Sequence, residues 1–134
     1  MFKLQLRYLS FFLGLISILS FFNIIYSYYL NWYLNIDTYY FSLIISLFLS
    51  IFFYKINKIN NKQSIFDKIL TVFFGYILIP LILSIPFYFS IYNLTFLDSY
   101  FEAISGFTST GFTIFENIKH IDQSLILWRS SSQW

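Results

Sequence analysis

The 134-residue sequence predicts an all-α integral membrane protein with three transmembrane helices, a re-entrant pore helix and a filter loop. Composition is the first observation: 58% of the residues are hydrophobic and 10% are charged, whereas soluble domains carry about 25% charged residues. The second observation is three long hydrophobic stretches, at about 9–30, 39–54 and 69–92. The third is a shorter apolar segment, 95–107, which runs into a turn rich in threonine, serine and glycine.

The three hydrophobic stretches differ in how well their lengths fit a bilayer. A hydrocarbon core of about 30 Å needs about 20 helical residues, so the first and third stretches are long enough to span it. The second is near the lower limit, and Thr38, Tyr39 and Tyr40 extend it if they lie at the interface. In the third stretch, Pro80 and Pro86 each remove a backbone donor. We therefore expect a bend there, with a gating hinge as the alternative.

The first stretch follows Lys3 and Arg7, as the apolar part of a signal peptide would. It is longer than the usual 7 to 15 residues of such a segment, and no Ala-x-Ala-like cleavage site follows. The sequence therefore predicts an uncleaved helix.

Basic residues indicate the orientation of the helices. The segment 31–37 between the first two helices has no basic residue. Basic residues precede the first helix and follow the second: Lys3, Arg7, Lys55, Lys58, Lys62 and Lys68. Because cytoplasmic loops carry the excess of lysine and arginine, the N-terminus is predicted to be cytoplasmic. The short segment 95–107 is then entered from the outside. We divide the chain into a transmembrane hairpin, 1–58, and a pore-like part, 59–134.

Charge and cysteine content exclude other classes of protein and site. The net charge is +2, and the basic residues are spread over membrane flanks, so the lipid bilayer is an expected partner and nucleic acid is not. There is no cysteine, which excludes disulfides and thiolate metal sites. His120, near Glu116 and Asp122, is expected to be solvated, and no structural metal or cofactor is predicted. An enzyme is not predicted, because no nucleophile with a base and no acidic dyad occurs at membrane depth.

The segment 95–107 has the features of a pore helix. Thr95 followed by Asp98 is a helix-capping pair, and the segment is only about 20 Å long as a helix, too short to cross a membrane. A helix that stops at mid-depth is tolerated where it lines a watery cavity or is buried in protein. Its C-terminal end carries about half a negative charge and favours a cation beyond it.

The residues after this helix are candidates for an ion filter. Carbonyl oxygens of Thr108, Ser109, Thr110, Gly111 and Phe112 are expected to replace the hydration shell of a cation. Gly111 is expected to adopt positive φ or to allow a close backbone approach. A Thr-Ser-Thr-Gly sequence also forms ordinary turns, so a turn is the alternative.

Several motifs resemble the first pore repeat of bacterial Trk and Ktr potassium transporters, which are relatives of the plant HKT proteins. They are residues 98–112 (DSYFEAISGFTSTGF), 127–130 (LWRS) and 133–134 (QW), together with 84–87 (SIPF) before the pore helix. The resemblance implies four helix, pore-loop, helix repeats around a central potassium pathway, each with one filter glycine, here Gly111. It further implies potassium as the transported ion, a homodimer, a cytoplasmic nucleotide-binding regulatory subunit and a bacterial inner membrane.

The resemblance also implies that this chain is an N-terminal fragment. About ten residues, from Ser124 on, are available for the helix after the filter, whereas a span needs about 20. The chain is therefore expected to be truncated at the start of that helix and to be inactive by itself. The alternative function is a small membrane-embedded accessory or structural protein with no pore.

Two charged residues are expected to support the filter. Glu102 lies inside the predicted pore helix, where it either accepts hydrogen bonds from neighbouring loops or contacts the cation directly. Arg129 begins the last helix. It either reaches the membrane interface, as long basic side chains do, or tethers the pore loop to that helix.

Overall fold

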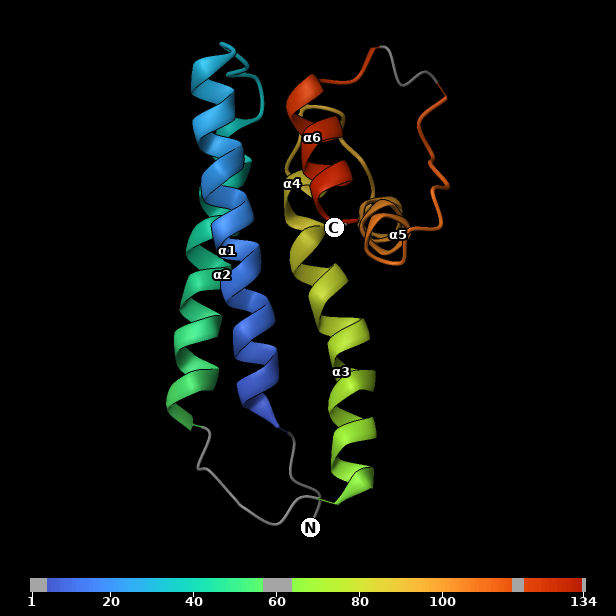
Figure 1. Ribbon diagram of the computed structural model, residues 1–134. Coiled ribbons are helices and arrows are strands. Elements are labelled where there is room, and N and C mark those ends of the chain that lie inside the picture. The colour runs from blue at the N-terminus through green and yellow to red at the C-terminus, as the bar shows by residue number, and fades with distance from the viewer. Residues whose placement is uncertain (1–4, 57–63, 117–119, 134) are drawn as a thin grey trace.

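The computed structural model describes residues 5–56, 64–116 and 120–133, and within these ranges the secondary structure is helical, with no strand. The helices in chain order are α1 (Leu6–Tyr29), α2 (Ile36–Ile56), α3 (Ile65–Leu83), α4 (Ile85–Tyr88), α5 (Phe96–Phe107) and α6 (Gln123–Ser131). In Figure 1, the axes of α1, α2 and α3 are roughly aligned, and the chain runs through α2 in the direction opposite to α1 and α3. In the same view α5 is seen nearly end-on, and α6 lies between the α1–α2 hairpin and α5.

Three helical segments are long and apolar enough to cross a membrane: Leu6–Tyr29, Ile36–Ile56 and Ile65–Tyr88. Among the described residues, the number of candidate spans therefore agrees with the prediction, as expected of a multi-pass membrane protein. The helices begin a few residues before the hydrophobic stretches do, because polar residues form their first turns. At α3 the cause is a capping box, in which the Ser64 side chain accepts from the Phe66 N–H at 3.3 Å and Asp67 bonds back to Ser64.

The α1–α2 hairpin is packed through small polar side chains. Ser20 Oγ donates to Ser42 Oγ at 3.1 Å, and Ser50 Oγ donates to the Ser10 carbonyl at 2.8 Å. A Cβ on Gly14 would lie 3.4 Å from Ser50 Oγ, which shows how closely the helices approach. Most large apolar side chains of the pair are exposed instead. Small residues between the helices and large apolar residues facing outward are typical of helix packing in lipid.

The third apolar helical segment is interrupted near its C-terminal end. Helix α3 contains Pro80 and ends at Leu83, and α4 follows with Pro86 in its first turn. The helix assignment is thus interrupted at Ser84, between the two prolines where we predicted a bend, and helical structure ends at Tyr88 rather than continuing to residue 92. At the break, Trp128 Nε1 of α6 donates to the Leu83 carbonyl at 3.0 Å. A neighbouring helix thereby provides a donor where the helix is interrupted.

Candidate functional site

The short helix α5 begins as its sequence predicts. Thr95 is the N-cap, and its Oγ1 accepts from the Asp98 N–H at 3.2 Å and donates to Asp98 Oδ2 at 2.7 Å. The helix has 12 residues, which is well below the about 20 residues of a span. Its axis crosses the direction of α3 (Figure 1). Whether it enters a membrane stays a prediction; its 12 residues are too few to span one.

The loop after α5 folds back onto the C-terminal end of that helix. The N–H of Ser109 donates to the Gly106 carbonyl at 2.9 Å, and the N–H of Thr110 donates to the Ser105 carbonyl at 3.1 Å. Ser109 has φ of 57°, a left-handed conformation that sequence reasoning did not assign to it. These bonds satisfy the last carbonyls of the helix, as a helix terminus requires. The loop is therefore fixed to α5 at its start.

Gly111 adopts φ of 79°, which confirms the predicted positive φ. A Cβ built on Gly111 would meet no atom within 4 Å in the described chain. The glycine is therefore required by the backbone conformation and not by lack of space, because only glycine adopts such angles without strain.

Glu102 connects α5 to the chain that follows the loop. Its side chain is fully buried, at 0% exposure. Glu102 Oε1 accepts from the Thr113 hydroxyl at 2.7 Å and from the Ile114 N–H at 2.5 Å. Accepting bonds from the neighbouring loop is one of the two roles that the sequence predicts for this carboxylate.

Arg129 of α6 completes the arrangement. Its Nε lies 3.1 Å from Glu102 Oε2, and its Nη2 donates to the Phe112 carbonyl at 2.6 Å and to the Gly111 carbonyl at 3.2 Å. The side chain is 17% exposed, so it does not extend into the surroundings as a snorkelling arginine would. The structure favours the tether over the snorkelling alternative. We refer to Glu102 and Arg129 together as the Glu–Arg bracket.

The bracket divides the predicted filter residues into two groups. The carbonyls of Gly111 and Phe112 accept hydrogen bonds from Arg129, and Ser105 Oγ also donates to Phe112. The carbonyls of Thr108, Ser109 and Thr110 take no donor from the described residues, and all three residues are exposed. Of the predicted filter carbonyls, those of residues 108–110 are therefore the ones with no hydrogen-bond donor among the described residues.

The threonine hydroxyls of the loop are already engaged within the chain. Thr108 Oγ1 donates to the Ile104 carbonyl at 2.8 Å, and Thr110 Oγ1 lies 3.2 Å from Ser105 Oγ. These hydroxyls therefore fix the backbone. Sequence reasoning missed Ser105 and Thr113 as supporting residues, and the only signal for them was a hydroxyl near the loop.

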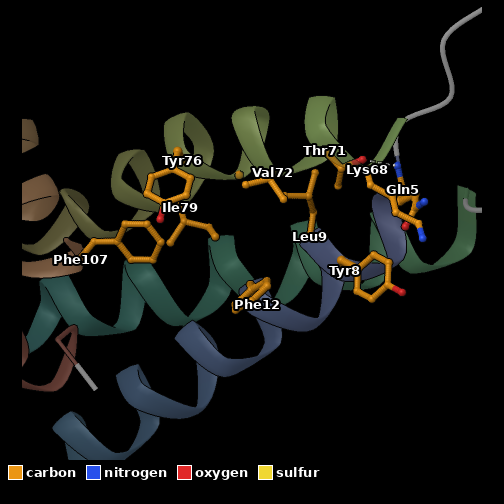
Figure 2. Close-up of a pocket in the computed structure, with 11 residues that line it drawn as sticks. Gln5, Tyr8, Leu9, Phe12, Lys68, Thr71, Val72, Tyr76, Ile79 and Phe107 are labelled. Carbon is orange, nitrogen blue, oxygen red and sulfur yellow. Dashed lines mark hydrogen bonds between the residues drawn. The ribbon is translucent and has the colours of Figure 1, made fainter. Parts of the chain in front are cut away.

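A pocket of about 440 Å³ lies elsewhere, between α1 and α3. Figure 2 shows that aromatic and aliphatic side chains make up most of its wall, with Phe107 at one end and Gln5 and Lys68 at the other. Neither the filter residues 108–112 nor the Glu–Arg bracket lines it. Phe107, the last residue of α5, is the part of the predicted pore helix that lines this pocket.

Comparison with known proteins finds a similarity at low identity. No family model matches the chain, and no solved structure matches it. The chain is 28% identical over 123 residues to a protein of Methanocaldococcus jannaschii described as an uncharacterized cation transporter. The aligned region covers 90% of this chain and 26% of that protein. The chain is therefore similar, at low identity, to part of a protein described as an uncharacterized cation transporter.

Proposed function

We propose that this chain forms part of a potassium uptake pathway of the Trk type, in which residues 108–112 provide one strand of the ion filter. The observation that carries the proposal is the exposed loop with three unengaged carbonyls, held at the C-terminal end of α5 by the Glu–Arg bracket. Similarity to a described cation transporter supports transport of a cation. The choice of potassium rests on the motifs of residues 98–112.

The electrostatics of the loop favour a dehydrated cation. The C-terminal end of α5 directs about half a negative charge toward residues 108–110. The positive charge of Arg129 is balanced by Glu102 at 3.1 Å, so the bracket adds little net repulsion. Carbonyl oxygens replace water around an ion when they are held in place before it arrives. The Arg129 contacts to Gly111 and Phe112 provide that rigidity.

A filter of this kind needs further strands. The Thr-Ser-Thr-Gly sequence occurs once in the 134 residues, so other strands must come from other segments or other chains. The chain spans 26% of the length of its described relative. The homodimer, the cytoplasmic nucleotide-binding subunit, the bacterial inner membrane and the cytoplasmic N-terminus are part of the proposal.

The proposal is tested by cation uptake into bacteria that lack their own potassium uptake systems and produce the full-length gene product. Rubidium tracer uptake, with competition by potassium or sodium, measures selectivity. Gly111→Ser should reduce the preference for potassium over sodium, because its φ of 79° strains a residue with a Cβ. Ile65→Ser, at a 76% exposed position at the start of α3, is the control and should keep the preference. Unchanged selectivity in Gly111→Ser would contradict the filter assignment.

A second experiment separates the filter from the accessory-protein alternative. Ser109 is exposed and the sequence has no cysteine, so Ser109→Cys introduces a single thiol into the loop. If residues 108–110 bind potassium, a membrane-impermeant thiol reagent should label this cysteine more slowly in potassium than in lithium at equal ionic strength. Equal labelling rates in the two salts would favour an ordinary turn.

A further inference from the structure

We propose that the α1–α2 hairpin positions the filter loop through two polar contacts to α6, made by Asn35 and Tyr39. The inference rests on the proposed function, because it assigns a role in ion selectivity to residues far from the loop. Arg129, which holds the loop, lies on the same short helix as the residues that the hairpin contacts. The hairpin thus acts on the filter through α6.

The first contact joins the turn of the hairpin to the start of α6. Asn35 lies between α1 and α2 and is 2% exposed. Its Nδ2 donates to Asp122 Oδ2 at 2.7 Å, while its Oδ1 accepts from the Ile91 N–H at 3.1 Å. Asp122 is the N-cap of α6, and its Oδ1 accepts from the Ser124 N–H at 3.1 Å. One buried amide therefore links the hairpin, the chain before α5 and the cap of α6.

The second contact lies one helical turn further along the hairpin. Tyr39 is fully buried at 0% exposure, and its hydroxyl lies 2.8 Å from Ser124 Oγ. Its ring packs against the Trp128 ring with centroids 5.8 Å apart. Trp128 is 1% exposed and its indole donates to Leu83, so α6 is held from both sides, by α2 and by α3. In Figure 1, α6 lies between the α1–α2 hairpin and α5.

The geometry of α6 explains how these contacts reach the loop. The helix has nine residues, from Gln123 to Ser131, and a rise of 1.5 Å per residue places Arg129 about 10 Å from Asp122 along the axis. A short helix moves as a unit, so a tilt at its start displaces the Arg129 guanidinium. That group makes a 2.6 Å bond to the Phe112 carbonyl, and such bonds weaken steeply when the donor is misaligned.

Asn35→Asp tests the first contact with a side chain of nearly the same shape. The aspartate keeps an acceptor for Ile91 but places a carboxylate against Asp122, where the amide donor was. We expect the preference for potassium over sodium to fall by up to about tenfold, the effect of losing about 1.4 kcal/mol of positioning. The double variant Asn35→Asp with Asp122→Asn exchanges donor and acceptor, keeps a good N-cap residue and should restore selectivity.

Tyr39→Phe tests the second contact, and Tyr40→Phe is its matched control. Both changes remove one hydroxyl from neighbouring residues of α2, but within the described part of the chain the Tyr40 hydroxyl bonds to Tyr28 of the hairpin, at 3.2 Å, and not to α6. Tyr39→Phe should lower selectivity and Tyr40→Phe should not. Selectivity is measured as the ratio of potassium uptake to sodium uptake, each normalised to the amount of protein in the membrane. A folding defect alone would therefore reduce both uptakes without changing the ion preference.

A readout independent of transport separates this inference from the proposed function. Phe112 is 71% exposed, so Phe112→Cys reports the mobility of the loop by its rate of reaction with a thiol reagent. We expect Asn35→Asp and Tyr39→Phe to raise that rate and the double exchange to restore it. Absence of potassium uptake in the parent protein, with these rate changes present, would contradict the proposed function only. Potassium uptake with unchanged selectivity and labelling rates in both variants would overturn the inference about the hairpin.

Discussion

Arg129→Gln and Glu102→Gln remove opposite halves of the same ion pair, and their effects on stability should be unequal. Arg129 is 17% exposed, whereas Glu102 is 0% exposed. Removing the arginine leaves a fully buried carboxylate without its counter-charge. Removing the glutamate charge leaves a guanidinium that keeps two carbonyl acceptors, those of Gly111 and Phe112, and some access to its surroundings.

The expected magnitudes follow from these environments. Breaking a buried ion pair by removing one partner costs about 3–5 kcal/mol when the other charge stays buried, which applies to Arg129→Gln. Glutamine at position 102 retains an oxygen to accept from Thr113 and Ile114, so the loss is mainly that of charge assistance, about 1–2 kcal/mol. We therefore predict that Arg129→Gln lowers the free energy of unfolding by about 2 kcal/mol more than Glu102→Gln does.

The measurement is equilibrium unfolding of the purified protein in mild detergent, titrated with a denaturing detergent and followed by helical circular dichroism. Arg7→Gln, the same chemical change at an exposed position in the first turn of α1, is the control and should stay within about 0.5 kcal/mol of the parent. Equal losses in the two bracket variants, or a larger loss in Glu102→Gln, would refute the argument from burial.

Three further predictions concern single side chains. Thr95→Ala removes the cap of α5 and should lower the free energy of unfolding by about 1 kcal/mol; an unchanged value would show that the cap is dispensable. Gly106→Ala places a Cβ 2.5 Å from Ser132 Oγ, so it should lower the thermal midpoint, and Ser132→Ala should recover most of the loss. Asn23 is 2% exposed, and neither amide atom has a partner among the described residues. Asn23→Leu should therefore raise the thermal midpoint in detergent, because burying an unpaired amide is unfavourable; a lower midpoint would indicate that the amide is bonded.

Some local features of the site were predictable because they depend on neighbouring residues. The start of α5 follows from Thr95 and Asp98, three residues apart, and Gly111 can adopt positive φ because it lacks a Cβ. The same reasoning applied to Ser64 and Asp67 would have placed the start of α3, which we expected four residues later. Local capping signals were thus sufficient where they were used.

The contacts that hold the loop were less accessible to sequence reasoning. From the sequence, the Arg129 side chain could extend to the membrane interface or turn toward the pore loop. The packed structure shows that it turns toward the loop, where it pairs with Glu102. Asn35 gives no signal at all in the sequence, since asparagine is an ordinary turn residue. Its pairing with Asp122 depends on how the hairpin packs against α6.

The sequence by itself determined the membrane character of the chain, its three apolar helices and the short capped helix before the Thr-Ser-Thr-Gly loop. Those features follow from hydrophobic length and from interactions within a few residues. Tertiary structure alone decided which carbonyls of the loop are engaged by Arg129, and that α6 is held between the hairpin and α3. The reason is that hydrogen bonds are short and directional, so partners distant in sequence are selected only when packing brings them into line.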